Sequence, residues 1–181
     1  MRLVIILSSF VLLPSLTVAQ QLRGDIERHI LDNNKEIVLE LWQALKIPAV
    51  AKDAVNIRKK ANFLRERLQA RDFKAELLET SGNPLVYGER KIAGATRTIL
   101  VYCHYDGQPV DASKWDQANP FIPVLRDGKL NEGGQIIDFD VQDKFRSDWR
   151  IYARSSSDDT APIIAMLATL DALDSLGVSP S

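Results

Sequence analysis

His104 and Asp106 stand two positions apart, directly after an apolar run. In an extended segment, side chains with this spacing point to the same face. A neutral imidazole can bind a metal through one nitrogen while a carboxylate accepts a hydrogen bond from the other and fixes the tautomer. The spacing therefore fits a metal ligand with its orienting acid. It also fits a plain His–Asp hydrogen bond at a strand end, since H-x-D arises often by chance.

A second acidic pair, Asp158 and Asp159, precedes a helical pattern of apolar residues. Carboxylates at a helix start usually cap free backbone N–H groups and complement the helix dipole. The three serines at 155–157 favour this capping interpretation. The alternative is a carboxylate placed between two cations, which two-metal hydrolases hold about 3.5–4 Å apart.

The elements that must position these residues follow from apolar periodicity. Helical spacing predicts one or two helices over 24–45 and further helices over 52–71 and 160–176. Shorter β-rich stretches predict strands at 73–79, 85–89, 121–126 and 149–152. The continuous apolar run 98–103 predicts a central strand covered on both faces. The polar, Gly/Asp-rich stretch 131–148 predicts a surface insertion.

This order predicts an α/β fold with a mixed, mostly parallel sheet flanked by helices. In such sheets, ligands bind beyond the carboxyl ends of the strands. Both acidic clusters occupy places of this kind, because His104 follows the predicted strand 98–103 and Asp158 precedes the last helix.

The N-terminus has the layout of a secretory signal peptide over residues 1–19. Arg2 precedes an apolar run, and the small residues Thr17 and Ala19 suit cleavage after Ala19. We therefore expect a secreted or periplasmic protein that begins near residue 20. The lone cysteine, Cys103, excludes an intramolecular disulfide and is expected to be a small buried hydrophobe.

The charge is nearly balanced, with 23 basic and 24 acidic residues and a net charge of −1. No basic surface argues for nucleic acid as a partner. Beyond the N-terminus, no segment is long and apolar enough for a membrane span. The 181 residues suffice for one domain with its own core.

Two ordered motifs resemble one known family. Residues 101–115 (VYCHYDGQPVDASKW) and 152–173 (YARSSSDDTAPIIAMLATLDAL) are similar to the two metal-site motifs of M20 zinc metallopeptidases, in particular of the dipeptidase and carnosinase-like branch. The stretch between them follows the family as well. The resemblance implies a zinc-exopeptidase-like catalytic domain, with residues 20–181 as its N-terminal part and with the dimerisation domain and C-terminal part absent.

The resemblance also implies residue roles. His104 would bind one zinc ion, Asp158 would bridge two zinc ions, and Asp106 would be the catalytic acid that orients His104. The Asp158–Asp159 peptide bond is a candidate for the cis form. The sequence departs from the family pattern around these residues, with Ala153 and Ser155 for two glycines and with Thr160 and Ala161 for a lysine and a glycine.

The function implied is hydrolysis of a peptide bond in dipeptides or short peptides by a di-zinc exopeptidase, which in its full-length form is a possible homodimer. The chain alone is expected to be inactive, because the family's catalytic Glu pair and remaining ligands lie downstream. The other histidine, His29, is expected at a solvent edge. Two alternatives stay open: an N-acyl amino acid amidohydrolase or deacetylase of the same superfamily, and a degenerate, non-catalytic homologue that binds a peptide or partner.

Overall fold

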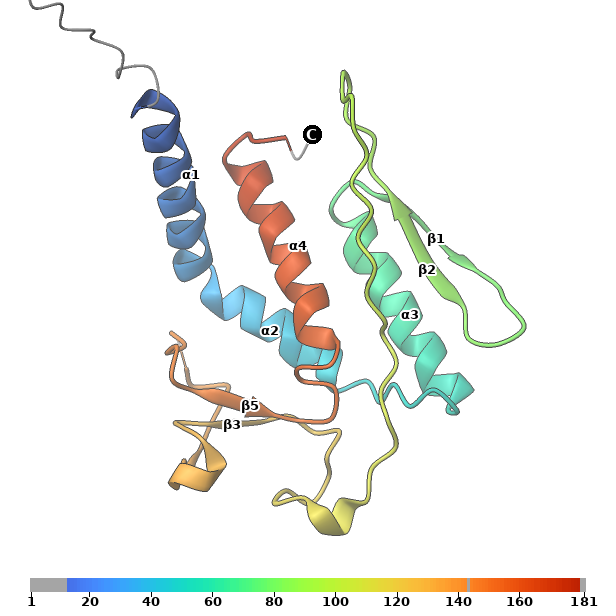
Figure 1. Cartoon of the computed structure of the whole chain (residues 1–181). Helices are drawn as coiled ribbons and strands as arrows, with labels where there is room; N and C mark the ends of the chain where they lie inside the picture. Colours follow the sequence, from blue (N-terminus) through green and yellow to red (C-terminus); the bar gives the residue numbers. More distant parts are fainter. Residues whose placement is uncertain (1–12, 143, 180–181) are drawn as a thin grey trace, which may run out of the picture.

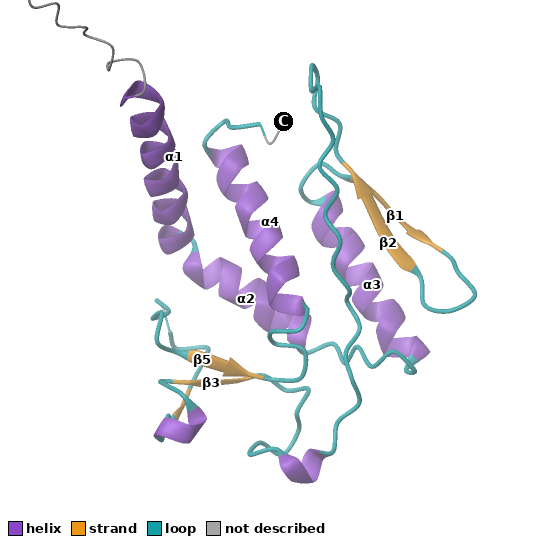
Figure 2. Ribbon diagram, viewed as in Figure 1, coloured by secondary structure: helices purple, strands orange, loops and turns teal. Residues whose placement is uncertain are grey.

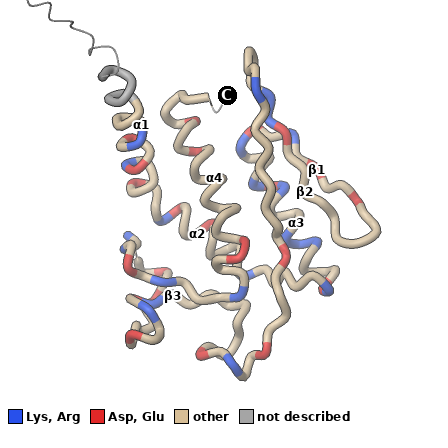
Figure 3. The backbone as a smooth tube through the Cα atoms, viewed as in Figure 1, with Lys and Arg blue, Asp and Glu red and all other residues tan. Residues whose placement is uncertain are grey.

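The computed structural model describes residues 13–142 and 144–179 (Figure 1). Helix α4 packs against α1 and α2, while α3 carries a β-hairpin on its outer side (Figures 1 and 2). Acidic and basic residues are interspersed along the chain (Figure 3). Within the described residues, no helix is both long and apolar enough to cross a bilayer. The helices are α1 (Leu13–Asp32), α2 (Asn34–Leu45), α3 (Ala54–Gln69) and α4 (Thr160–Ser175).

Helices α2, α3 and α4 lie where the apolar periodicity predicts them, whereas α1 begins at Leu13, before the predicted start at residue 24. The expected helical region 24–45 is divided at Asn33, between α1 and α2. Helix α3 begins after Asp53, whose side chain accepts a hydrogen bond from the backbone N–H of Asn56 and so caps the first turn. At the N-terminus, α1 continues without a break through Ala19, where cleavage was predicted. Residues 1–12, the rest of the predicted signal peptide, lie outside the described residues.

The α/β class is confirmed, but the mostly parallel sheet is wrong for the described residues. Strands β1 (Lys74–Leu78) and β2 (Leu85–Glu89) form an antiparallel hairpin. A second sheet has the order β4-β3-β5 and is also antiparallel. Its strands are β3 (Val124–Arg126), β4 (Ile136–Ile137) and β5 (Arg150–Tyr152).

The connections explain this difference. A parallel pair needs a crossover of a dozen or more residues, usually through a helix, whereas short turns join antiparallel neighbours. Here a short turn joins β1 to β2, and the link from β3 to β4 contains only the three-residue 3-10 helix Leu130–Glu132, which is too short for a crossover. The parallel pairing that the described residues contain is a single bridge between Val50 and Gly107.

The predicted central strand 98–103 is also wrong, because this run joins no sheet among the described residues. It forms an extended thread alongside α3 (Figure 1). Leu100 is 90% exposed and Tyr102 is 84% exposed. An apolar, β-rich run is buried only when other strands or helices cover both of its faces, and the described residues cover one side at most.

The stretch 131–148, predicted as a surface insertion, is in part packed. Strand β4 lies inside it, and Phe139 is buried. The ring of Phe139 stacks on Trp42 of α2 with centroids 4.1 Å apart, and Phe145 and Trp149 extend the aromatic group. Stacked aromatic rings bury large apolar areas, so this stretch is anchored to α2.

The hydrophobic core lies where α4 meets α2 and α3. It contains Ala44 of α2, Leu64 of α3, and Ile163, Ile164 and Leu167 of α4. The apolar residues of α4 lie on nearly all of its faces, which suits a helix covered on several sides. The start of α4, just after the Asp158–Asp159 pair, is thereby fixed to the body of the protein.

A candidate metal centre at the start of the last helix

The segment that carries His104 is held at a few points. The hydroxyl of Tyr105 donates a hydrogen bond of 2.5 Å to the carbonyl of Pro84. The backbone N–H of Gly107 donates to the carbonyl of Ala49 at 2.7 Å. Cys103 and Tyr105 pack against the core from its edge. Cys103 is only partly buried, so the expectation of a buried hydrophobe is met in part, and this burial raises the pKa of its thiol.

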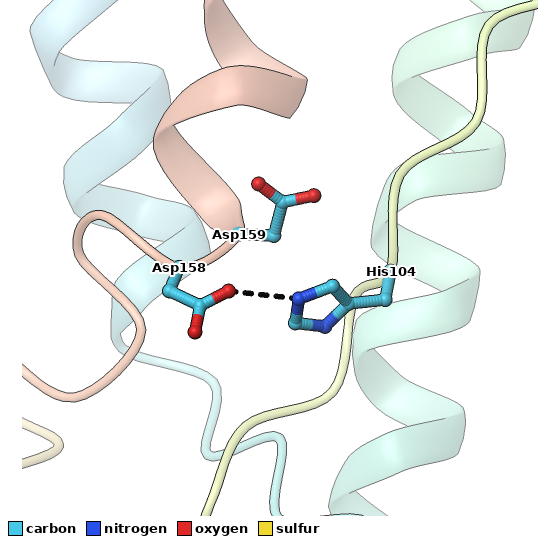
Figure 4. A group of neighbouring side chains, drawn as sticks. All are labelled: His104, Asp158 and Asp159. Atoms are coloured by element: carbon cyan, nitrogen blue, oxygen red, sulfur yellow. Dashed lines mark hydrogen bonds and ion pairs between the residues drawn. The ribbon is translucent and has the colours of Figure 1, made fainter.

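Both ring nitrogens of His104 face carboxylates. Nδ1 lies 3.1 Å from Asp106 Oδ1, and Nε2 lies 2.8 Å from Asp158 Oδ1 (Figure 4). Partial burial lowers the pKa of His104, but its hydrogen bonds with Asp158 and Asp106 outweigh burial and raise it. A neutral imidazole carries one N–H and can donate to only one of the two acids. With an acceptor at each ring nitrogen, this geometry therefore favours the doubly protonated imidazole.

The two acids at the start of α4 do not act as ordinary caps. Asp159 occupies the N-cap position, yet its side chain makes no capping hydrogen bond. The side chain of Asp158 is 85% exposed. The peptide bond between them is cis, as expected from the sequence. The capping interpretation thus fails at the residue best placed for it. The carboxylate of Asp158 points at the ring of His104, and the carboxylate of Asp159 lies nearby but is turned away from that ring (Figure 4).

Three donors gather within the range of one metal ion. One ligand atom each from His104, Asp158 and Asp159 lies within 4.8 Å of the others. An imidazole nitrogen with carboxylate oxygens is a donor set that suits zinc, and catalytic zinc usually has three protein ligands. The acid behind Nδ1, Asp106, would fix the ring so that Nε2 points at the ion. The residues present therefore fit a metal.

The structure brings together the three residues that the sequence singled out, His104, Asp106 and Asp158, and adds Asp159. The adjacency of Asp159 to Asp158 was the available signal, but capping explained it equally well. The second histidine, His29, lies apart from this group. Its Nδ1 is 2.9 Å from the hydroxyl of Ser175, which is the last residue of α4, whereas the acids precede the first.

A polar pocket of about 270 Å³ opens beside the candidate centre. Gly107 approaches the loop before α4 so closely that a Cβ there would overlap the hydroxyl oxygen of Ser155. Arg154 places its guanidinium over the ring of Trp115, 5.4 Å from the centroid. The pocket thus has room for a small polar group next to the carboxylates of Asp106 and Asp158. Its lining consists of His104, Asp106, Gly107, Gln108 and residues 153–158.

Known proteins resemble this chain over most of its length. The Cys-Gly metallodipeptidases dug1 of Schizosaccharomyces pombe and DUG1 of Candida albicans are each 26% identical to it, over 82% and 78% of the chain. The chain spans about 30% of the length of these curated relatives. No family model matches the chain.

Solved structures agree. The di-peptidase Dug1p from Saccharomyces cerevisiae has a TM-score of 0.65 at 23% identity, over 86% of this chain and 32% of its own. An M20 family metallo-carboxypeptidase from Sulfolobus solfataricus has a TM-score of 0.60 at 32% identity, over 78% of this chain and 28% of its own. The resemblance to M20 metallopeptidases drawn from the sequence is thereby confirmed, and the fold is that of part of such a peptidase.

The comparisons correct the predicted location. The similar yeast Cys-Gly metallodipeptidases are cytosolic enzymes, which contradicts a secreted or periplasmic assignment. The uninterrupted course of α1 through Ala19 gives no support to a cleavage site there.

Proposed function

We propose that this chain forms the metal-binding part of a metal-dependent peptidase that hydrolyses the peptide bond of dipeptides or short peptides. The observation that carries the proposal is the convergence of His104, Asp158 and Asp159, with Asp106 hydrogen bonded behind the histidine. The similarity to metallodipeptidases and to a metallo-carboxypeptidase supports it. In this proposal the chain is the N-terminal part of a catalytic domain.

The proposed residue roles rest on the family resemblance and are supported by the donor set. His104 and Asp158 are the proposed ligands, with Asp159 as a further one, and Asp106 keeps His104 in the tautomer that presents Nε2. Zinc is the expected metal, with two ions in the complete site and Asp158 between them. Bound metal polarises a scissile carbonyl and lowers the pKa of water. The pocket beside the acids would receive the polar end of a short peptide, and the longer protein is proposed to be a homodimer.

The first test is zinc binding by the chain itself. Because His104 supplies the nitrogen donor, His104→Ala should weaken zinc affinity beyond the roughly 10–100-fold typical of losing a supporting residue. Asp158→Asn should do the same, and Asp106→Asn should fall within that range. The other histidine offers the matched control, since His29→Ala should leave the affinity unchanged. Calorimetric titration with zinc measures all four; equal affinities in the wild type and His104→Ala would refute the proposal.

Hydrolysis then separates the substrate classes. We expect zinc-dependent cleavage of a dipeptide such as Cys-Gly to exceed cleavage of an N-acetylated amino acid when the longer protein is assayed. The opposite preference would favour an amidohydrolase, and zinc binding without either activity would favour a non-catalytic homologue.

A further inference from the structure

One buried charge lies next to the candidate centre. Lys60 of α3 is 1% exposed, although lysine is almost never fully buried unless it is paired. Among the described residues, no carboxylate forms an ion pair with it. Burial lowers its pKa to about 8. An apolar side chain of similar volume would fill this position at less cost, so packing alone does not account for a lysine here.

The contacts of Lys60 lead to the acid pair. Its Nζ donates hydrogen bonds to the carbonyl of Ala44, at 2.6 Å, and to the hydroxyl of Thr160, at 3.4 Å. Ala44 lies in the last turn of α2, where the helix dipole favours a positive charge. Thr160 is the first residue of α4 and follows Asp159 directly. The ammonium group therefore joins three helices at the point where the acids emerge.

Thr160 closes the loop that presents these acids. Its backbone N–H donates to the carbonyl of Ser155 at 3.3 Å, and its side chain is buried against Lys60. Because Thr160 is hydrogen bonded to Ser155, a residue that holds Thr160 in place also restrains the other end of the segment 155–160. The family resemblance places a lysine at position 160, and the structure has instead a threonine there with a lysine from α3 against it.

We propose that Lys60 is a positioning residue for the metal centre: by holding Thr160, it keeps the Asp158–Asp159 turn facing His104. This rests on the proposed function.

The test is a double-mutant cycle on zinc binding. Lys60→Met and Thr160→Val should each weaken zinc affinity by roughly tenfold or more, as the loss of a supporting residue does. The double variant should be no weaker than the weaker single variant, because both changes break one contact. The neighbouring exposed lysine gives the control, and Lys59→Met should match the wild type. Lys60→Met leaves the buried Ala44 carbonyl and the Thr160 hydroxyl without this donor and should lower the melting temperature, so zinc affinity is measured well below the melting temperature of every variant.

Two results would overturn the inference: wild-type zinc affinity in Lys60→Met, or strictly additive losses in the double variant. If the wild type itself binds no zinc, the proposed function fails, and amide exchange in the metal-free protein decides the inference. Faster exchange at Thr160 and Ile163 in Lys60→Met than in Lys59→Met would then support it, and equal exchange would refute it.

Discussion

The two segments that meet at the candidate centre are built in opposite ways. Asp158 and Asp159 lie between β5 and α4, and α4 supplies three of the core residues. His104 lies on the extended thread of residues 98–107, which joins no sheet among the described residues and on which Leu100 is exposed. The acid side of the site is therefore fixed by packing, whereas the histidine side depends on a few hydrogen bonds. A metal ion at this site would need ligands from both segments. The less firmly held thread therefore limits how precisely the ligands are positioned.

The largest expected effect tests the packed side. Leu167→Ala removes a core side chain that is 1% exposed and should lower the free energy of unfolding by about 2–5 kcal/mol. Leu100→Ala, the same change on the thread, should stay within about 0.5 kcal/mol of the wild type, because surface substitutions usually do. Denaturant unfolding measures both. Similar losses in the two variants would show that the thread is buried in solution and that the contrast is mistaken.

The contrast between the packed acid side and the exposed thread also explains which elements can be predicted from the sequence. The helices and the hairpin follow from local periodicity and turn residues, and local signals suffice where an element is covered by its sequence neighbours. The run 98–103 has an equally strong local signal, but burial of a strand depends on partners that no local pattern specifies. The prediction of a mostly parallel sheet is wrong for the same reason, because no local pattern specifies the partners of a strand.

The candidate site shows the same limit. His104, Asp106 and Asp158 were found because their types and order match two motifs, so their roles could be proposed before any geometry. Asp159 was missed because capping and metal binding leave the same signature at a helix start. Lys60 gave no signal at all, since nothing in an amphipathic helix indicates which lysine turns inward to Thr160.

A smaller effect is expected where the thread touches the acid side. A methyl group in Gly107→Ala would overlap the Ser155 hydroxyl, so either the Ser155 side chain must rotate or the loop before α4 must move. We expect a loss of about 1–3 kcal/mol in unfolding free energy, as overpacking typically causes, together with weaker zinc binding. Gly82→Ala is the control, since its new methyl would meet only the Thr80 hydroxyl, at 3.8 Å. Calorimetry and denaturant unfolding of both variants measure this, and an unaffected Gly107→Ala would contradict the prediction by showing that rotation of the Ser155 side chain alone relieves the overlap.

The smallest effect isolates one anchor of the thread. Tyr105→Phe removes the hydroxyl that donates to Pro84 and should cost about 0.5–1.5 kcal/mol, the usual net value of one hydrogen bond. Its more telling result should be local: amide exchange should quicken around residues 103–107, while α4 keeps its protection, because α4 is held by the core. Tyr102→Phe alters an exposed tyrosine of the same thread and should change neither quantity. If Tyr105→Phe loosened α4 as much as the thread, the two sides of the site would be one cooperative unit, and the precision of the centre would come from the core rather than from the thread's own anchors.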